Sequence, residues 1–286
     1  MVLDKTWFSE PHPATGSAFS LKLKAKLFDE RSPFQHIEVY ATEDFGNLMV
    51  IDGCIMVTQR DNFLYHEMLT HPALFTHPDP KRVLIVGGGD CGTLREVLKH
   101  PGVEQVIQVD VDEMVTRASE QYFPELCESN GDPRAQVRFA NGIAWVQNTS
   151  PGSYDVLLVD STDPVGPAEG LFAALFFRDC HRALGDQGLL VQQSESPLFH
   201  LESILKPLHR NLREAGFAAV HTLHFPQCVY PSGWWTVTLA GNIGPLTRFR
   251  EQDVANKPFA TEYYNVDIHR ASLATPEFMR RALVEL

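Results

Sequence analysis

The stretch Val83–Val97, VLIVGGGDCGTLREV, runs from a continuous apolar segment through a glycine-rich turn into a segment of helical spacing. The β-branched run at Val83–Val86 predicts a buried strand, and the turn Gly87–Gly92 has the spacing G-x-G-x-x-G. Asp110 stands 23 residues after Gly87, at the end of a second predicted strand, where a carboxylate can bind both hydroxyls of a ribose. This succession predicts a nucleotide-binding α/β unit, although a glycine-rich turn can also serve tight packing alone.

Downstream of this stretch, apolar segments of strand length alternate with segments of helical spacing. Repeated units of this kind predict a mostly parallel, doubly wound sheet, and hence an α/β fold. Ligands of such sheets bind at the carboxyl ends of the strands, so functional residues are expected in the turns that follow them. The predicted strands are Val83–Val86, Val103–Val109, Val137–Phe139, Tyr154–Val159, Leu189–Gln193 and a closing antiparallel pair, Phe217–Phe225 with Trp235–Gly241; the predicted helices are Leu94–His100, Asp112–Tyr122, Ile143–Asn148, Leu171–Leu184 and His200–Ala215.

Upstream, residues 1–60 have the pattern of β structure and predict a small N-terminal β domain, followed by a larger domain over residues 61–286. The dipeptide Asp52-Gly53 between two apolar segments is typical of a hairpin turn. Asp61 is expected to cap the first helix of the larger domain. The predicted strands of the small domain are Gln35–Thr42, Leu48–Ile51 and Cys54–Thr58.

The composition argues against several classes of partner. The 36 acidic residues outnumber the 24 basic ones, and a net charge of −12 disfavours nucleic acid and favours small cations, although many soluble proteins are acidic for solubility alone. No apolar run reaches the roughly 18 residues of a membrane span, and the N-terminal residues do not resemble a signal peptide. Five cysteines without a CxxC pair predict reduced thiols and a cytoplasmic protein. The histidines show no metal-ligand spacing, so neither a metal nor a redox cofactor is expected.

Asp90, within the glycine turn, bears on the choice of nucleotide. The pyrophosphate of a dinucleotide would meet this carboxylate, and so would the carboxylate of S-adenosylmethionine; repulsion between like charges in a cleft is costly. A donor that carries a bare ammonium at this place would instead be attracted. Decarboxylated S-adenosylmethionine is such a donor, because its adenosine suits Asp110 and its aminopropyl ammonium suits Asp90.

A second acidic segment, Asp160–Pro167, follows the fourth predicted strand of the large sheet. An amine nucleophile with a pKa of about 10.4 is mostly protonated at neutral pH. A carboxylate that holds this ammonium and accepts its proton would therefore promote attack, and both Asp160 and Asp163 are candidates. Asp-Pro sequences are also common in turns, so the two aspartates could instead be turn or cap residues.

These segments resemble the spermidine synthase family, and the resemblance runs from about Trp7 to the C-terminal helix Pro276–Leu283. It implies transfer of an aminopropyl group from decarboxylated S-adenosylmethionine to putrescine, which yields spermidine and 5′-methylthioadenosine. It also implies a Rossmann-like, methyltransferase-type domain behind a small N-terminal β domain, in homodimers or homotetramers that bind small molecules and no cofactor. The most specific segments are Tyr65–Met68, Val83–Val97, Asp160–Pro167, Tyr230–Gly233, Tyr263–Asn265 and His269–Ala271.

The resemblance also implies roles for individual positions. Asp160 corresponds to the general base, and Asp90 corresponds to the ligand of the aminopropyl ammonium. Trp7 corresponds to an N-terminal residue that walls off the acceptor pocket. The remaining donor-binding positions are Gln35, Gly87, Gly89, Asp110, Asn141 and Gly142, and the remaining acceptor-binding positions are Tyr65, His66, Asp163, Gln193 and Tyr230.

The chain departs from the family pattern at three positions around the donor. Family members commonly carry glycine at the position of Cys91, glutamate at that of Asp110 and aspartate at that of Asn141. The last position corresponds to the acid that pairs with the adenine amino group. An asparagine can still accept there through its carbonyl oxygen, but without charge.

On the acceptor side, His66 replaces the glutamine of some relatives, and Trp234-Trp235 crowds the segment after Tyr230. Three alternatives therefore stay open: an aminopropyltransferase for spermidine, cadaverine or agmatine, a small-molecule methyltransferase on the same fold, and a non-catalytic relative that senses nucleosides or polyamines. Asp90 argues against the methyltransferase, because a methyl donor keeps its carboxylate.

Overall fold

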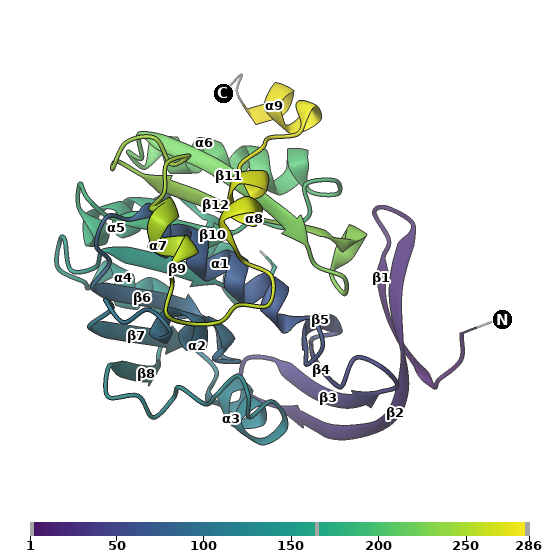
Figure 1. The fold of residues 1–286 in the computed structure, drawn as a ribbon. Helices are drawn as coiled ribbons and strands as arrows, with labels where there is room; N and C mark the ends of the chain where they lie inside the picture. The colour runs from purple at the N-terminus through teal and green to yellow at the C-terminus, as the bar shows by residue number, and fades with distance from the viewer. Residues whose placement is uncertain (1–2, 164–165, 284–286) are drawn as a thin grey trace.

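The computed structural model describes residues 3–163 and 166–283, and Figure 1 shows their arrangement. A five-stranded sheet from the N-terminal part of the chain lies beside a seven-stranded sheet with helices on both faces. The predicted Rossmann-like α/β fold with a small N-terminal β domain is confirmed. Within the described residues, no helix is long and apolar enough to cross a lipid bilayer.

The N-terminal sheet is antiparallel, with the strand order β1-β2-β3-β4-β5. Its last hairpin turns at Asp52 and Gly53, both with positive φ (50° and 86°), and this geometry explains why the Asp-Gly dipeptide predicts the turn correctly. The long hairpin of β1 and β2 extends away from the core and is largely exposed; the pattern predicts it only as part of a β-rich region. The strands are β1 (Trp7–His12), β2 (Ser17–Arg31), β3 (His36–Thr42), β4 (Asn47–Ile51) and β5 (Cys54–Thr58).

The seven-stranded sheet has the order β11-β12-β10-β9-β6-β7-β8. The five neighbouring strands β10, β9, β6, β7 and β8 are parallel to one another. Strand β12 is antiparallel to both of its neighbours, as predicted for the closing pair. The order reverses between β6 and β9, so their carboxyl ends form the crevice in which such sheets bind ligands. The strands are β6 (Arg82–Gly87), β7 (Gln105–Asp110), β8 (Ala135–Phe139), β9 (Val156–Asp160), β10 (Leu189–Gln193), β11 (Ala219–Pro226) and β12 (Trp234–Gly241).

The helices cover both faces of this sheet, with α1 and α2 on one face and α4, α5 and α6 on the other. The pattern predicts neither α7 nor α8, two short helices of five and seven residues. The helices are α1 (Asn62–Thr76), α2 (Gly92–Leu98), α3 (Glu113–Tyr122), α4 (Gly142–Gln147), α5 (Ala174–Leu184), α6 (Lys206–Glu214), α7 (Glu251–Ala255), α8 (Val266–Ser272) and α9 (Glu277–Leu283).

Two predicted helices are divided, and one predicted cap is not made. A 3₁₀ turn over Gly166–Phe172, rich in glycine, precedes α5. A π-helical turn over Leu201–Leu205 precedes α6, because Pro207 has no N–H to continue the regular bonding. Asp61 stands at the predicted N-cap position of α1, but its carboxylate accepts from Thr58 Oγ1 (2.5 Å) instead of from the helix backbone.

Helix α1 is buried along nearly its whole length, and the C-terminal part of the chain packs across it. The side chain of Glu67, a residue that is 1% exposed, accepts bonds from three consecutive backbone N–H groups, those of Glu262 (2.7 Å), Tyr263 (2.9 Å) and Tyr264 (2.7 Å). A buried carboxylate costs free energy unless it is bonded, and these donors supply the bonds. Two of the segments that resemble the family, Tyr65–Met68 and Tyr263–Asn265, are far apart in the sequence but meet at this carboxylate.

Replacing Glu67 with alanine should lower the free energy of unfolding by about 3 kcal/mol, since the change removes one charged acceptor that three N–H donors share. Urea unfolding followed by circular dichroism measures the effect. Glu251→Ala, which removes an ion pair with Arg270 at the surface, is the control and should cost far less. Equal losses in the two variants would contradict this role of Glu67.

Candidate active site

The residues predicted at the nucleotide end of the sheet meet at the crevice between β6 and β9. The glycine turn leaves β6, Asp110 ends β7, Asp160 ends β9 and Gln193 ends β10. They lie at one edge because the carboxyl ends of parallel strands meet there. Gly88 N donates to the backbone oxygen of Asp160 (2.8 Å), and this bond joins the turn directly to the end of β9.

The glycines of the turn allow close contact with functional side chains. Gly87 has a φ of 85°, and a Cβ built on it would stand 2.1 Å from the backbone oxygen of Asp160. A Cβ built on Gly92 would stand 2.2 Å from Cε1 of the His66 ring. The sequence left tight packing open as an alternative to close approach of a ligand. Tight packing is one function of these glycines, because the absence of a Cβ lets Asp160 and His66 lie directly against the turn.

Asp160 is held by hydroxyl groups from two helices. Tyr65 of α1 donates to Oδ1 (2.8 Å), and Thr93 of α2 donates to Oδ2 (2.6 Å). Burial raises the pKa of this carboxyl group, and the nearby charge of Asp90 raises it further. A carboxylate with a raised pKa binds a proton more readily, so the geometry suits a general base for an attacking amine.

Asp90 is paired with His66, whose Nε2 lies 3.1 Å from Asp90 Oδ2, while Gly92 N donates to Asp90 Oδ1 (2.9 Å). Burial alone would raise the pKa of Asp90 and lower that of His66. The attraction between the two charges overcomes burial, so the pKa of His66 is raised and that of Asp90 is lowered. Both side chains are therefore stabilised in their charged forms.

His66, predicted to bind the acceptor, has its ring against Asp90, which is predicted to bind the donor. Successive residues of an α-helix point about 100° apart. For this reason Tyr65 reaches Asp160 while its neighbour reaches a different carboxylate.

Asp110 lies beside the glycine turn, where a Cβ on Gly89 would stand 3.0 Å from its Oδ2. Burial raises the pKa of Asp110 to about 6, and neighbouring aspartate charges add to the rise. Gln35 reaches this region through Ser32, whose hydroxyl accepts from Gln35 N (3.1 Å) and donates to Asp112 Oδ2 (2.6 Å). The N-terminal sheet therefore adjoins the predicted ribose-binding side of the site.

Asn141 and Gly142 stand at the start of α4. Asn141 is exposed and caps this helix, since its Oδ1 accepts from Ala144 N (3.0 Å). The side-chain oxygen of Asn141, expected to pair with an adenine amino group, thus already accepts a hydrogen bond from the helix backbone. Asparagine often has this capping role at the start of a helix. Gly142 packs against β6, where a Cβ would stand 2.5 Å from Val86 Cγ1.

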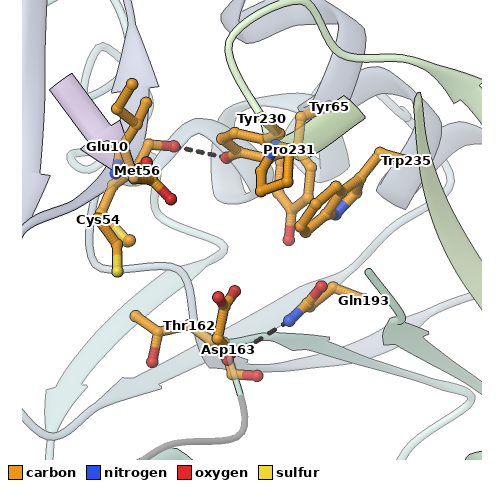
Figure 2. A pocket seen from close by; sticks show the side chains of 12 residues that line it. Glu10, Cys54, Met56, Tyr65, Thr162, Asp163, Gln193, Tyr230, Pro231 and Trp235 are labelled. Carbon is orange, nitrogen blue, oxygen red and sulfur yellow. Dashed lines mark hydrogen bonds between the residues drawn. The ribbon is translucent and has the colours of Figure 1, made fainter. Parts of the chain in front are cut away.

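A cavity lies between the N-terminal sheet and the carboxyl end of the large sheet (Figure 2). Four residues predicted to bind the acceptor line it, namely Tyr65, Asp163, Gln193 and Tyr230. Pro164 and Val165, from the predicted acceptor segment, lie outside the described residues. The remaining lining residues are Glu10, Cys54, Ile55, Met56, Ser161, Thr162, Pro231 and Trp235.

The described structure does not place Trp7, the expected wall residue, at this cavity. Of the described residues that line the cavity, β1 contributes Glu10 and not Trp7. Side chains alternate along a strand, so residues three positions apart point to opposite faces. The buried face of β1 at this place therefore carries a carboxylate instead of an indole.

One wall of the cavity is aromatic. Tyr230 packs edge to face against Tyr65 (ring centroids 5.8 Å apart) and against Trp235 (4.7 Å). Its hydroxyl donates to the backbone oxygen of Met56 (2.5 Å), which ties this wall to the N-terminal sheet. Figure 2 shows Asp163 across the cavity from these rings. A flexible apolar chain with a cationic end fits walls of these two kinds.

Three carboxyl groups, those of Glu10, Asp163 and Glu195, lie close enough for their charges to interact. Burial raises the pKa of Glu10 to about 7 and that of Asp163 to about 8, with the charge of Glu195 adding to the second shift. Burial also raises the pKa of Glu195, a residue that is 0% exposed and accepts from Gln193 Nε2 (3.1 Å). A cationic group bound at this end of the cavity would stabilise the charged forms of these carboxyl groups.

The sequence pattern predicts neither Glu10 nor Glu195 as a site residue. Glu195 follows Gln193 by two positions, and residues at that spacing share one face of an extended chain. The predicted site residue Gln193 could therefore have indicated Glu195 as well. Glu10 has no comparable signal, because it reaches the cavity from another sheet.

Comparison with known proteins agrees with this geometry. The sequence model of the spermine/spermidine synthase domain matches residues 62–250, and that of the spermidine synthase tetramerisation domain matches residues 6–59. The polyamine aminopropyltransferase of Thioalkalivibrio sulfidiphilus is 63% identical over 283 residues, which cover 99% of each chain. That of Methylococcus capsulatus is 63% identical over 280 residues, or 98% of each chain. This chain belongs to the spermine/spermidine synthase family.

Solved structures of the family have the same fold. A crystal structure of spermidine synthase in complex with the transition state analogue AdoDATO superposes with a TM-score of 0.94 at 34% identity, covering 99% of this chain and 97% of that one. Spermidine synthase from Thermotoga maritima gives a TM-score of 0.92 at 34% identity, covering 98% and 94%. The predicted aminopropyltransferase class is confirmed, and the chain is an enzyme.

The departure from the family pattern at Cys91 concerns the backbone. Cys91 precedes α2 with a φ of 68°, in the left-handed region that glycine adopts without strain and other residues enter at a cost of about 1–2 kcal/mol. Its buried Sγ accepts from Gln108 Nε2 (3.6 Å). The glycine that is common at this position in the family therefore suits the turn itself.

Gly87→Ala should destabilise the protein by about 2–4 kcal/mol and lower its activity, because a Cβ there meets the backbone of Asp160 at a positive φ. Thermal unfolding and turnover, measured on the same preparation, test both effects. Gly102→Ala is the matched control: a Cβ there meets nothing within 4 Å, so stability should change by about 0.5 kcal/mol or less. Wild-type stability in Gly87→Ala would show that the turn can move away from β9.

Proposed function

We propose that this enzyme is a spermidine synthase that transfers the aminopropyl group of decarboxylated S-adenosylmethionine to putrescine. The observation that carries the proposal is the position of Asp160. Its carboxylate stands between the Asp90 pair on the donor side and the acidic cavity, which Tyr65 also lines. The solved relative, a spermidine synthase in complex with the transition state analogue AdoDATO, supports a synthase activity for this fold.

In the proposed reaction, the amine nitrogen of putrescine attacks the aminopropyl carbon that is bonded to the sulfonium sulfur. The C–N bond forms as the C–S bond breaks, and the bonding electron pair leaves with sulfur to give neutral 5′-methylthioadenosine. The proton lost by the nitrogen passes to Asp160, whose two oxygens are already oriented by hydroxyl donors. The leaving group departs without charge, so this chemistry requires neither a metal nor a redox cofactor.

On the donor side, we assign the aminopropyl ammonium to Asp90 and the ribose hydroxyls to Asp110. The charged form of Asp90 is favoured by His66, and this keeps a negative group where the donor has its ammonium. S-adenosylmethionine would bring a carboxylate to the same place and would be repelled. The assignment therefore favours the decarboxylated donor and an aminopropyl transfer over a methyl transfer.

On the acceptor side, we assign the butylene chain of putrescine to the aromatic wall formed by Tyr65, Tyr230 and Trp235. Its distal ammonium is assigned to Glu10 and Asp163, because an ammonium would stabilise their charged forms against the cost of burial. One amine thus faces the base while the other is held in its charged form, and this arrangement selects a diamine.

The oligomeric state and location are proposed on separate grounds. The match of residues 6–59 to a tetramerisation domain supports a homo-oligomer, which we propose to be a dimer or tetramer. The five free cysteines support a reducing compartment, and we propose the cytoplasm.

Mass spectrometry of products tests this function. The purified enzyme should form spermidine and methylthioadenosine from decarboxylated S-adenosylmethionine and putrescine, and should form less product with cadaverine, agmatine or spermidine as acceptor. Asp160→Asn should lower turnover about 100- to 10,000-fold, as expected for loss of a general base, with donor affinity largely kept. Asp267→Asn, at the surface, is the control. Methylated product, or wild-type turnover in Asp160→Asn, would refute the proposal.

Glu10→Gln should raise the KM for putrescine about 10-fold and change kcat little, because it removes one charged partner of the distal ammonium. The pKa of Glu10 is about 7, so its carboxylate is charged above pH 7 and neutral below it. The difference between wild type and variant should therefore be largest near pH 8.5 and should vanish near pH 6. Steady-state kinetics across this range measures it, and a constant ratio would place the distal ammonium elsewhere.

A further inference from the structure

Two groups of histidine and carboxylate side chains stand out in the part of the chain that the structure describes. In each group, three potential ligand atoms lie within 4.8 Å of one another, a spacing compatible with one shared metal ion. The two groups are His66, Asp90 and Asp160 at the active site, and Asp29, His36 and Glu38 on the N-terminal sheet.

The two groups differ in how their charge is balanced. On the N-terminal sheet, Lys26 Nζ lies 2.6 Å from an oxygen of each of the two carboxylates, so a lysine ammonium already stands between them. At the active site, two carboxylates share one imidazole. Arg95 also acts on this group through its charge, but its guanidinium is bonded to Glu96 Oε1 (2.9 Å). The active-site group therefore keeps excess negative charge that a cation can neutralise.

Each ligand of the active-site group is already oriented by another contact. Gly92 N holds Asp90 Oδ1, which leaves Oδ2 beside His66 Nε2 at 3.1 Å. Hydroxyl groups from α1 and α2 hold the two oxygens of Asp160. The ring of His66, a residue that is 1% exposed, packs against the glycine turn. Outer contacts of this kind fix ligand geometry and raise metal affinity.

We propose that His66, Asp90 and Asp160 bind a divalent transition metal ion of the zinc type, and that this ion inhibits the enzyme. One imidazole and two carboxylates with an open fourth position suit tetrahedral Zn²⁺ or Co²⁺, whereas Mg²⁺ prefers octahedral oxygen ligands. The bound ion neutralises Asp160 and excludes the donor ammonium from Asp90. The inhibition rests on the proposed function, whereas the metal binding does not.

Titration of the purified protein, without substrates, tests the binding. CoCl₂ followed by visible absorption should reveal one tetrahedral ion per chain, and ZnCl₂ should bind with the same stoichiometry by calorimetry. His66→Gln should weaken binding by about 10-fold or more, since it removes the imidazole ligand. His36→Gln removes the imidazole of the other group and is the matched control; it should bind metal like the wild type.

Three results would overturn the metal site: no binding at millimolar metal, binding that survives His66→Gln, and equal loss in His36→Gln. Circular dichroism verifies that each variant is folded, and Asp90→Asn provides the same test if His66→Gln is not. In steady-state assays, Zn²⁺ should raise the apparent KM for the donor without changing kcat. Metal bound through His66 that leaves this KM unchanged would overturn the inhibition and would point to a different donor site.

Discussion

The hydrogen bond from Gly88 N to the backbone of Asp160 joins the two strands between which the sheet reverses its order, and the active site is built around it. The bond requires a turn with positive φ and no Cβ at Gly87. With the two strand ends held together, α1 and α2 bring the hydroxyls of Tyr65 and Thr93 to one carboxyl group. This backbone hydrogen bond thus determines where the carboxylate of the proposed base, Asp160, lies.

In the proposed function, buried carboxyl groups on both sides of this base select for cationic substrates. Asp90 and Asp110 lie on the donor side, and Glu10 and Asp163 lie in the cavity. Burial makes each charge costly, and for all of these except Asp90, which pairs with a histidine, the pKa is raised. Cationic substrates stabilise the charged forms of these groups. The free energy that burial of the carboxylates costs the fold therefore contributes to the affinity for cations. The acidic composition alone could not have located this effect.

The N-terminal sheet takes part in the site. It contributes Glu10 from β1 and accepts the hydroxyl bond of Tyr230 at Met56. The acceptor cavity therefore exists only between the two sheets, and the large sheet alone would leave it open. The same residues match a tetramerisation domain, so the sheet that completes the cavity is also the one proposed to contact other subunits.

The sequence by itself determined the strands of the large sheet, the glycine turn and the aspartates at the strand ends, because these features depend on short-range periodicity and on the order of elements along the chain. Tertiary structure alone decided that Glu10 and not Trp7 faces the cavity, that His66 pairs with Asp90, and that Asn141 caps a helix. The physical reason is that a side chain's partner depends on which face of its element packs against a distant segment. Burial and packing between elements decide which face that is, and the local sequence pattern contains no information about this packing.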